Sequence, residues 1–182
     1  MRAEQIPEPW RSFLLQVDTQ LREDVELHCF GGFVVTMFYG LARLTADVDV
    51  IAIAPANAGG PLRGLAGKES ALHQKHGVYL DFVGIATVPE DYEQRLTEMF
   101  PKAFKRLRLY AFDPYDLALA KLERNIQRDR DDVKHLTRTI PLDVAILKDR
   151  YEKELRPYLG NPAREDLTLQ LWLEMIEEER SK

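Results

Sequence analysis

A pair of glycines and a pair of alternating aspartates, each beside an apolar run, constrain this chain more than any other feature. Gly31 and Gly32 end the run Val25–Phe30, and Asp47 and Asp49 open the next one. A glycine turn lets backbone approach a phosphate closely, because glycine has no Cβ. Two acids separated by one residue on a strand project to the same face, since side chains alternate with period two. The pattern therefore predicts a strand, a turn with a helix, and a second strand that together hold a metal-bound triphosphate.

The remaining patterns predict an α/β half followed by a helical half. Apolar runs indicate strands over 25–30, 48–54 and 77–84, and helical spacing indicates helices over 10–21, 33–39 and 68–75. The stretch 55–67 carries four glycines and two prolines and is expected to be a loop. Helices are expected over 115–136, 141–155 and 166–180, the first opened by Asp113 as N-cap and Pro114. We expect an α/β (α+β) fold with a small mixed, twisted sheet in residues 1–112 and a helical region, 113–182, packed on it.

Composition narrows the class of protein. The apolar share of 45% and the charged share of 30% are ordinary for a globular chain. A net charge of −5 argues against a general nucleic-acid binder, although not against a local basic patch. A single cysteine, Cys29, excludes an internal disulfide and a multi-cysteine metal site, as is usual in a reducing cytosol. The N-terminus lacks the apolar stretch of a secretory signal, and no run approaches the ~20 apolar residues of a membrane span. We expect a cytoplasmic protein with no membrane partner.

Three aspartates are the candidates for chemistry. A charge inside an apolar strand is costly unless it is paired or binds a metal, and Asp47 and Asp49 share one strand face. Mg2+ prefers carboxylate oxygens together with substrate phosphates. Asp81, also within an apolar strand, is expected to be a third carboxylate that acts as general base or completes the metal site. The alternatives are that Asp47 caps a loop, that Asp49 pairs with an arginine, and that Asp81 faces solvent on an edge strand.

The segment from Gly31 to Val50 resembles the signature of the DNA polymerase β-like nucleotidyltransferase superfamily. In that superfamily a glycine turn and a helix precede an Asp-x-Asp on the next strand. The closer resemblance is to minimal bacterial nucleotidyltransferases, including toxins of the AbiEii/MenT type. Their typical Arg-x-Thr-x-Asp-x-Asp string matches Arg43, Thr45, Asp47 and Asp49. The resemblance implies a nucleotidyltransferase-like sheet topology.

A second match lies downstream, where toxin-like members carry a lysine followed by Arg-Asp-x-x-Asp. Lys121, Arg128, Asp129 and Asp132 fit this pattern. The resemblance implies that Lys121 neutralises triphosphate charge, that Arg128 contacts a phosphate, and that Asp132 positions Lys121 or an acceptor group. The alternative is a solvated helix face with ion pairs between residues four apart.

The residues and the resemblance together predict a Mg2+-dependent nucleotidyltransferase, with Mn2+ as the alternative ion. It would move a nucleoside monophosphate from an NTP to a hydroxyl on RNA, such as a tRNA end, or on a protein. Asp47, Asp49 and Asp81 would form the metal site, and the expected nucleotide-binding residues are Gly31, Gly32, Arg43, Thr45, Lys121 and Arg128. A toxin role with a cognate antitoxin follows from the resemblance alone. The competing hypothesis is a catalytically inactive protein of the same fold that binds nucleotide or docks a partner.

Overall fold

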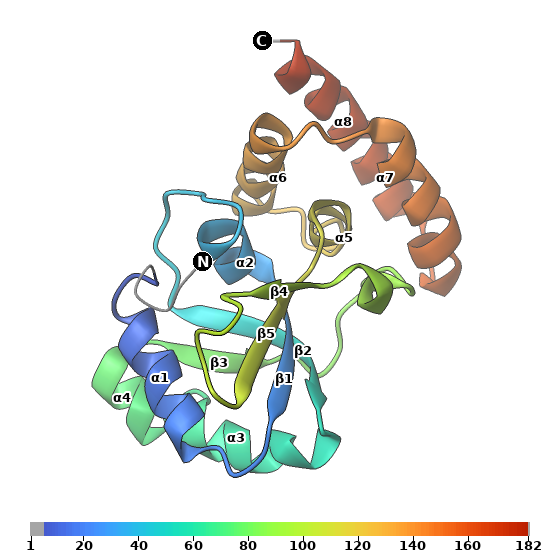
Figure 1. Cartoon of the computed structure of the whole chain (residues 1–182). Coiled ribbons are helices and arrows are strands. Elements are labelled where there is room, and N and C mark those ends of the chain that lie inside the picture. Colours follow the sequence, from blue (N-terminus) through green and yellow to red (C-terminus); the bar gives the residue numbers. More distant parts are fainter. Residues whose placement is uncertain (1–5, 182) are drawn as a thin grey trace. The chain divides into compact units, whose positions relative to one another are not determined.

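The structure is a computed structural model that describes residues 6–181. These residues form two compact units, whose elements are labelled in Figure 1. The first unit comprises the described part of Met1–Ile85 together with Leu96–Ala111, and the second comprises Ala86–Arg95 and the described part of Phe112–Lys182. The segment Ala86–Arg95 thus groups with the helical residues that follow it much later in the chain. The expected boundary between 112 and 113 remains a prediction.

A five-stranded mixed sheet is the centre of the first unit. Its strands are β1 (Val25–Phe30), β2 (Asp47–Ala54), β3 (Tyr79–Phe82), β4 (Thr97–Met99) and β5 (Leu107–Ala111). They lie in the order β3-β2-β1-β5-β4. The pairs β1–β2 and β4–β5 are antiparallel, whereas β1–β5 and β2–β3 are parallel. The predicted mixed α/β fold is confirmed, and the sheet contains two strands, β4 and β5, that no sequence pattern predicted.

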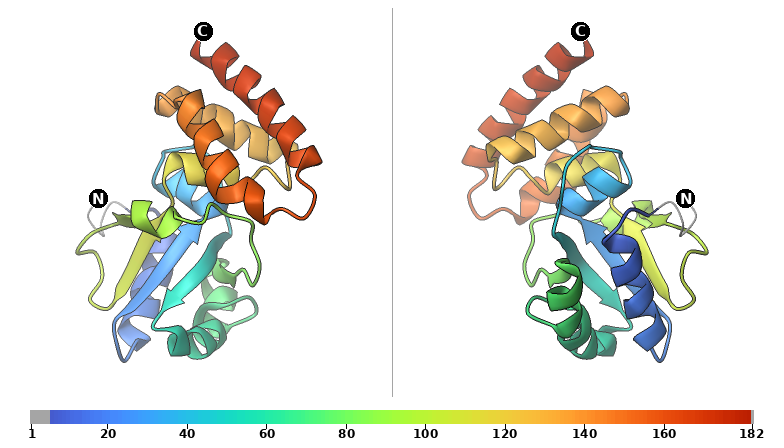
Figure 2. Two further views of the ribbon diagram at one scale, coloured as in Figure 1. Left: turned by 90° about the vertical axis from the view of Figure 1, so that its right-hand side faces the viewer. Right: turned by 90° about the vertical axis from the view of Figure 1, so that its left-hand side faces the viewer.

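One face of this sheet forms the core of the first unit. Val48 and Val50 of β2 and Leu80 of β3 are buried, while the residues between them in sequence are more exposed. Helix α1 (Trp10–Gln20) buries Phe13 and Leu14, as its predicted apolar stripe requires. Figure 2 shows α1 and α4 (Ala71–His76) on the same side of the sheet. The alternation along β2 therefore directs valines into the core and aspartates to the other face.

The expectation of a loop over 55–67 is wrong. A short 3-10 turn, Ala56–Ala58, leads into helix α3 (Gly59–Ala66) despite the glycines. Pro61 lies in the first turn of α3, where its missing N–H costs no helical hydrogen bond. Leu62 and Ala66 are buried, and this burial offsets the weak helix propensity of the glycines.

A buried carboxylate on α1 holds the start of β5. The side chain of Asp18 accepts hydrogen bonds from the backbone N–H groups of Lys105, Arg106 and Leu107, at 3.0, 2.7 and 2.8 Å. Asp18 is only 7% exposed, so these three donors supply the partners that a buried carboxylate needs. The basic run before β5 is thereby tied to the fold through its backbone.

The second unit contains four α-helices among the described residues: α5 (Pro114–Leu119), α6 (Gln127–Thr139), α7 (Val144–Arg150) and α8 (Ala163–Arg180). The predicted cap is confirmed, since the Asp113 side chain accepts from the Asp116 N–H at 2.8 Å. The single helix expected over 115–136 is wrong. Asn125 adopts a left-handed conformation with φ of 44°, and the Asp129 carboxylate accepts from the Ile126 N–H. The chain therefore stops one helix and begins another.

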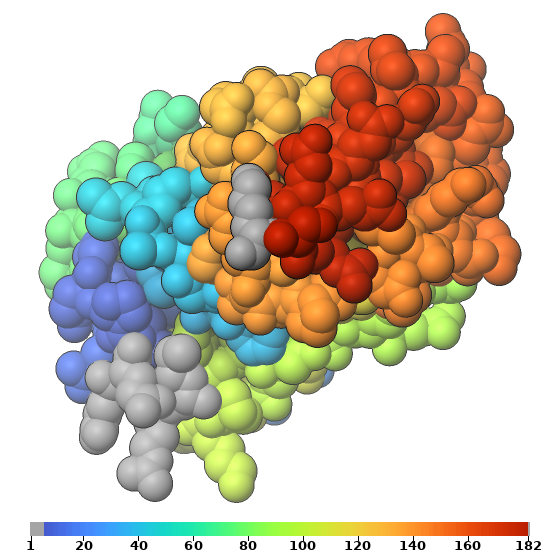
Figure 3. All heavy atoms as spheres, turned by 90° about the horizontal axis from the view of Figure 1, so that it is seen from above, coloured from blue at the N-terminus to red at the C-terminus, as the bar shows by residue number. Residues whose placement is uncertain are grey.

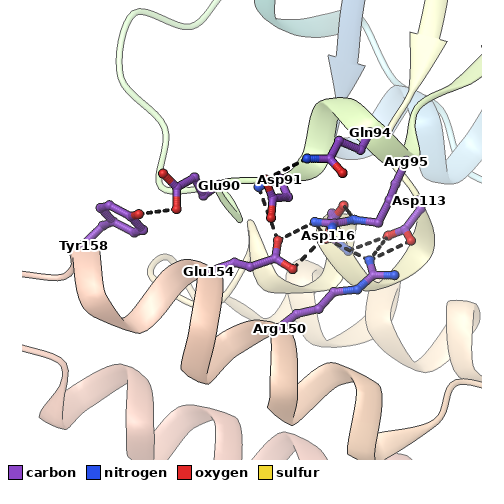
Figure 4. Close-up of polar contacts among 9 residues, drawn as sticks. All are labelled: Glu90, Asp91, Gln94, Arg95, Asp113, Asp116, Arg150, Glu154 and Tyr158. Carbon is purple, nitrogen blue, oxygen red and sulfur yellow. Dashed lines mark hydrogen bonds and ion pairs between the residues drawn. The ribbon is translucent and has the colours of Figure 1, made fainter.

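Ion pairs attach the segment Ala86–Arg95 to the helices of the second unit (Figure 4). Arg95 donates to Asp116 at 2.8 Å and to Glu154 at 2.6 Å, and Arg150 contacts Asp113 and Asp116 at 2.7 and 2.9 Å. Asp116 is fully buried, and this burial raises its pKa although Arg95 and Arg150 favour the charged form. A buried charge with two arginine partners indicates a structural tie between distant segments.

No helix within residues 6–181 has the length and apolar content needed to cross a bilayer.

Candidate active site

The three predicted carboxylates lie on adjacent strands of the first unit. Asp47 and Asp49 occupy alternating positions on β2, and β3 runs parallel to it with Asp47 opposite Tyr79 and Asp49 opposite Asp81. Paired residues of neighbouring strands project to the same side of a sheet. Asp47, Asp49, Tyr79 and Asp81 therefore share the face opposite the valine core, which we call the carboxylate face. The sequence analysis predicted all three carboxylates as one group, and the pairing of β2 with β3 places Asp81 opposite Asp49 on this face.

The carboxylate face is polar and accessible within the first unit. Asp47 and Asp49 are half-buried, and Asp81 is exposed on the edge strand β3. Farther across the sheet the same face carries the exposed Glu26 and the half-buried Tyr110. A polar face opposite an apolar one is usual for a sheet whose second face meets water or ligand.

The negative charges of all three carboxylates affect the pKa of Tyr79. Partial burial raises the pKa of Tyr79, and the negative charges of Asp47, Asp81 and Asp49 raise it further. Tyr79, which the sequence analysis did not include among the candidates, lies opposite Asp47 on the same face, as its alternation with Asp81 along β3 indicates.

Gly31 is required by the position of Asp49. It begins helix α2 (Gly31–Met37) with φ of 71°, in the left-handed region that favours glycine. A Cβ built on Gly31 would lie 1.8 Å from Oδ2 of Asp49, so no larger residue fits without moving that carboxylate. The glycine turn and the second aspartate, distant in sequence, are thus in contact. Gly32 follows as the second residue of α2, and the predicted approach of both glycines to phosphate remains a prediction.

Asp49 also affects the one cysteine. Burial raises the pKa of the Cys29 thiol well above its usual range, and the charge of Asp49 raises it further. A thiol in such surroundings stays protonated and is a poor nucleophile or metal ligand. Cys29 is therefore part of the core and not of the reactive group.

Thr45 contacts Asp47. Its hydroxyl lies 3.2 Å from Oδ1 and 3.2 Å from the backbone oxygen of Asp47, to which it donates. Arg43 and Thr45 both line a cavity of about 370 Å3 beside Trp10. They belong to the connection between α2 and β2, part of which forms the light blue surface in Figure 3; Leu44 between them is 95% exposed. The phosphate contacts expected of Arg43 and Thr45 are not tested by these positions.

Residues 6–181 contain no group of three or more His, Cys, Asp or Glu side chains arranged to hold a metal ion by themselves. Mg2+ in nucleotide enzymes, however, usually takes one or two carboxylates and completes its shell with substrate phosphates and water. The donor chemistry of Asp47 and Asp49 on one strand face fits such a partial site. The metal role of Asp47, Asp49 and Asp81 remains a prediction.

The downstream motif lies in the second unit as a buried ion-pair cluster. Nζ of Lys121 is 2.8 Å from Oδ2 of Asp132 and 3.5 Å from Oδ1 of Asp129, and Arg124 contacts Asp129 from the other side. Burial opposes ionisation of Asp129, but hydrogen bonds from Arg124 and the charge of Lys121 hold its pKa below the usual value. Lys121 is only 4% exposed. Among the roles expected of Asp132, the structure shows contact with Lys121.

Arg128, the remaining residue of that motif, is exposed on α6. Its expected contact with a phosphate is not tested. The structure thus brings Asp47, Asp49 and Asp81 together in the first unit, and Lys121 and Asp132 together in the second.

Comparison with known proteins relates the chain to a family. A family model described as "Nucleotidyltransferase of unknown function (DUF6036)" matches residues 12–180. No curated protein and no solved structure matches the chain. The matched range includes every residue of the two predicted motifs.

Proposed function

The chain belongs to the family of nucleotidyltransferases of unknown function, and we propose that it is a Mg2+-dependent enzyme that moves a nucleoside monophosphate from an NTP to a hydroxyl acceptor. The observation that carries this proposal is the pairing of β2 with β3, which aligns Asp49 with Asp81 on the face that also bears Asp47. Three carboxylates on one accessible face suit the handling of a metal-bound triphosphate and an acceptor proton.

In the proposed reaction, Asp47 and Asp49 hold the metal ion. When bound, Mg2+ supplies positive charge that stabilises the triphosphate and the departing pyrophosphate. Asp81 is exposed, so an acceptor can reach it, and its carboxylate takes the proton of the acceptor hydroxyl. The acceptor oxygen bonds to the α-phosphorus as the bond from that phosphorus to the bridging oxygen breaks. The bonding electron pair leaves with pyrophosphate.

The acceptor in this proposal is RNA, such as a tRNA end, or a protein hydroxyl. The net charge of −5 disfavours non-specific binding along nucleic acid, which leaves recognition of one end or one loop as the mode for RNA. Resemblance to AbiEii/MenT-type proteins supports a toxin neutralised by an antitoxin in the cytoplasm. Contacts of Arg43, Thr45, Lys121 and Arg128 with the triphosphate belong to the same proposal.

A transfer assay with matched variants tests this function. The protein is incubated with each α-labelled NTP, with and without Mg2+, and with total RNA or lysate protein as acceptor; label transfer and pyrophosphate release are measured. Asp47→Asn and Asp49→Asn should abolish Mg2+-dependent transfer. Glu26→Gln makes the same charge change on the same face, but Glu26 pairs with Ala54 at the opposite end of β2, so this control should stay active.

Two results would contradict the proposal. Transfer that is unchanged in Asp47→Asn and Asp49→Asn would show that these residues do not form the metal site. NTP binding without transfer to any acceptor would favour the inactive nucleotide-binding protein of the same fold. Circular dichroism of each variant distinguishes a chemical effect from unfolding.

A further inference from the structure

Helix α8 carries apolar side chains on two opposite sides. Its inner side packs on α6 and α7 (Figure 1) and buries Leu169, Trp172 and Ile176. Its outer side carries Leu167 and Leu171, which are 58% and 54% exposed. The outer side of a surface helix is usually polar, so two leucines one turn apart on it indicate a surface for association.

The exposed residues of α8 follow the spacing of a coiled-coil contact. They recur at alternating intervals of three and four positions, as Arg164, Leu167, Leu171, Glu174 and Glu178. This alternation keeps side chains in one line along a helix, where they can pack against a second helix. We call these five residues the α8 seam.

The order of residues in the α8 seam is self-complementary. From Arg164 to Glu174 it reads cation, leucine, leucine, carboxylate, at intervals of three, four and three. In an antiparallel pair of α8 helices centred between Leu167 and Leu171, each of these leucines meets the other kind from the partner. Arg164 then lies opposite Glu174 of the partner subunit. A twofold axis repeats each contact, as an interface between identical surfaces requires.

Charge favours this antiparallel arrangement over a parallel one. A parallel pair would place Glu174 and Glu178 opposite the same carboxylates of the second copy, where like charges repel. In the antiparallel pair, position 178 of one copy lies level with position 160 of the other. At a rise of about 1.5 Å per residue, the two Glu178 side chains are about 27 Å apart along the helices. That separation far exceeds the Debye length of about 8 Å at physiological ionic strength.

Arg164 is anchored at its place in the seam. Its Nη2 donates to the backbone oxygen of Glu123 at 2.7 Å. A guanidinium has five N–H donors, so this bond leaves others for a carboxylate of a second copy. The anchor limits the side-chain entropy that an ion pair with Glu174 of the partner subunit would cost.

We propose that the α8 seam is a homodimer interface in which two copies of this chain pack their α8 helices antiparallel. The inference is independent of the proposed enzymatic function. Two leucines and one arginine from each copy make a small contact, so the dimer is reversible and its population depends on protein concentration.

Sedimentation equilibrium of the full chain over a wide range of concentration tests the interface. The average mass of the wild type should rise toward that of two chains. Leu171→Asp places a charge in the apolar centre and should keep the protein monomeric. Arg164→Glu and Glu174→Arg each create two like-charge contacts in the symmetric dimer. Each should raise the dimer dissociation constant by at least about tenfold.

Complementary charges test the antiparallel register. An equimolar mixture of Arg164→Glu and Glu174→Arg should dimerise again, because both ion-pair positions of the mixed dimer join an arginine to a glutamate. Both substitutions in one chain should also restore the dimer. Arg180→Glu is the matched control: it makes the same charge change at an exposed position of α8 outside the seam, and should dimerise like the wild type.

Three results would overturn the inference. A wild type that stays monomeric at every concentration would leave a different protein as the occupant of this face. Dimers that persist in Leu171→Asp would place the interface elsewhere. Failure of the complementary mixture, or an equal loss in Arg180→Glu, would exclude the antiparallel pairing of Arg164 with Glu174. Circular dichroism of each variant establishes that its helices remain folded.

Discussion

The contact between Gly31 and Asp49 makes a quantitative prediction for Gly31→Ala. An alanine there must keep φ near 71°, which costs about 1–2 kcal/mol for a residue with a Cβ. Its Cβ would also lie 1.8 Å from Oδ2 of Asp49. Moving that carboxylate away from its rotamer adds about 0.5–1.5 kcal/mol. We expect Gly31→Ala to lower the free energy of unfolding by about 1.5–3.5 kcal/mol.

Gly40→Ala separates the conformational cost of a left-handed alanine from the cost of displacing the Asp49 carboxylate. Gly40 has a similar φ of 77°, but no heavy atom lies within 4 Å of the Cβ that it would acquire. Its variant should lose only the conformational part, about 1–2 kcal/mol. Adding Asp49→Ala should bring the cost of Gly31→Ala close to that range, because it removes the carboxylate and leaves only the Cβ of residue 49, at 3.2 Å. The difference is the coupling energy of a double-mutant cycle.

Urea unfolding followed by tryptophan fluorescence measures these values. Trp10 lies in the first unit and packs against Phe33 of α2 at 4.7 Å, whereas Trp172 lies in the second unit. A Trp172→Phe background therefore makes the signal specific for the unit that holds Gly31. Equal destabilisation by Gly31→Ala and Gly40→Ala, with no relief from Asp49→Ala, would refute the proposed contact.

The buried cluster of the second unit supports two further predictions. Lys121→Met leaves Asp132 and Asp129 without their shared cation and should lower the free energy of unfolding by about 3–5 kcal/mol, measured by urea unfolding. Adding Asp132→Asn should restore part of this loss. An unchanged urea midpoint in Lys121→Met would contradict the ion pairs. The lowered pKa of Asp129 means that the folded state favours its carboxylate, so its contribution is complete above the unfolded pKa of about 3.9 and is lost as the pH falls below it. Asp129→Asn should flatten the acid side of a plot of stability against pH, and an unaltered acid side would count against this account.

Local patterns predicted much of the first unit because they act over short distances in sequence. Alternation in β2 indicated which residues face the core, and Asp113 before Pro114 indicated a helix start. Predictions failed where distant residues decided the outcome. Burial of Leu62 made a helix from the glycine-rich stretch, and the donors around Asp18 shaped the chain before β5. Neither the packing around Leu62 nor the contact of Asp18 with the chain before β5 can be inferred from a short window of sequence.

For the candidate site, the sequence by itself determined which residue types share a strand face, and the tertiary structure determined which other residues lie beside them. The spacing of Asp47 and Asp49 required a shared strand face, because side-chain alternation is a property of the backbone. The alignment of Asp81 with Asp49, the place of Tyr79 beside Asp47, and the fit of Gly31 against Asp49 depend on strand register and on the path of α2. Register is set by hydrogen bonds between segments far apart in the chain, so only the folded structure decides it.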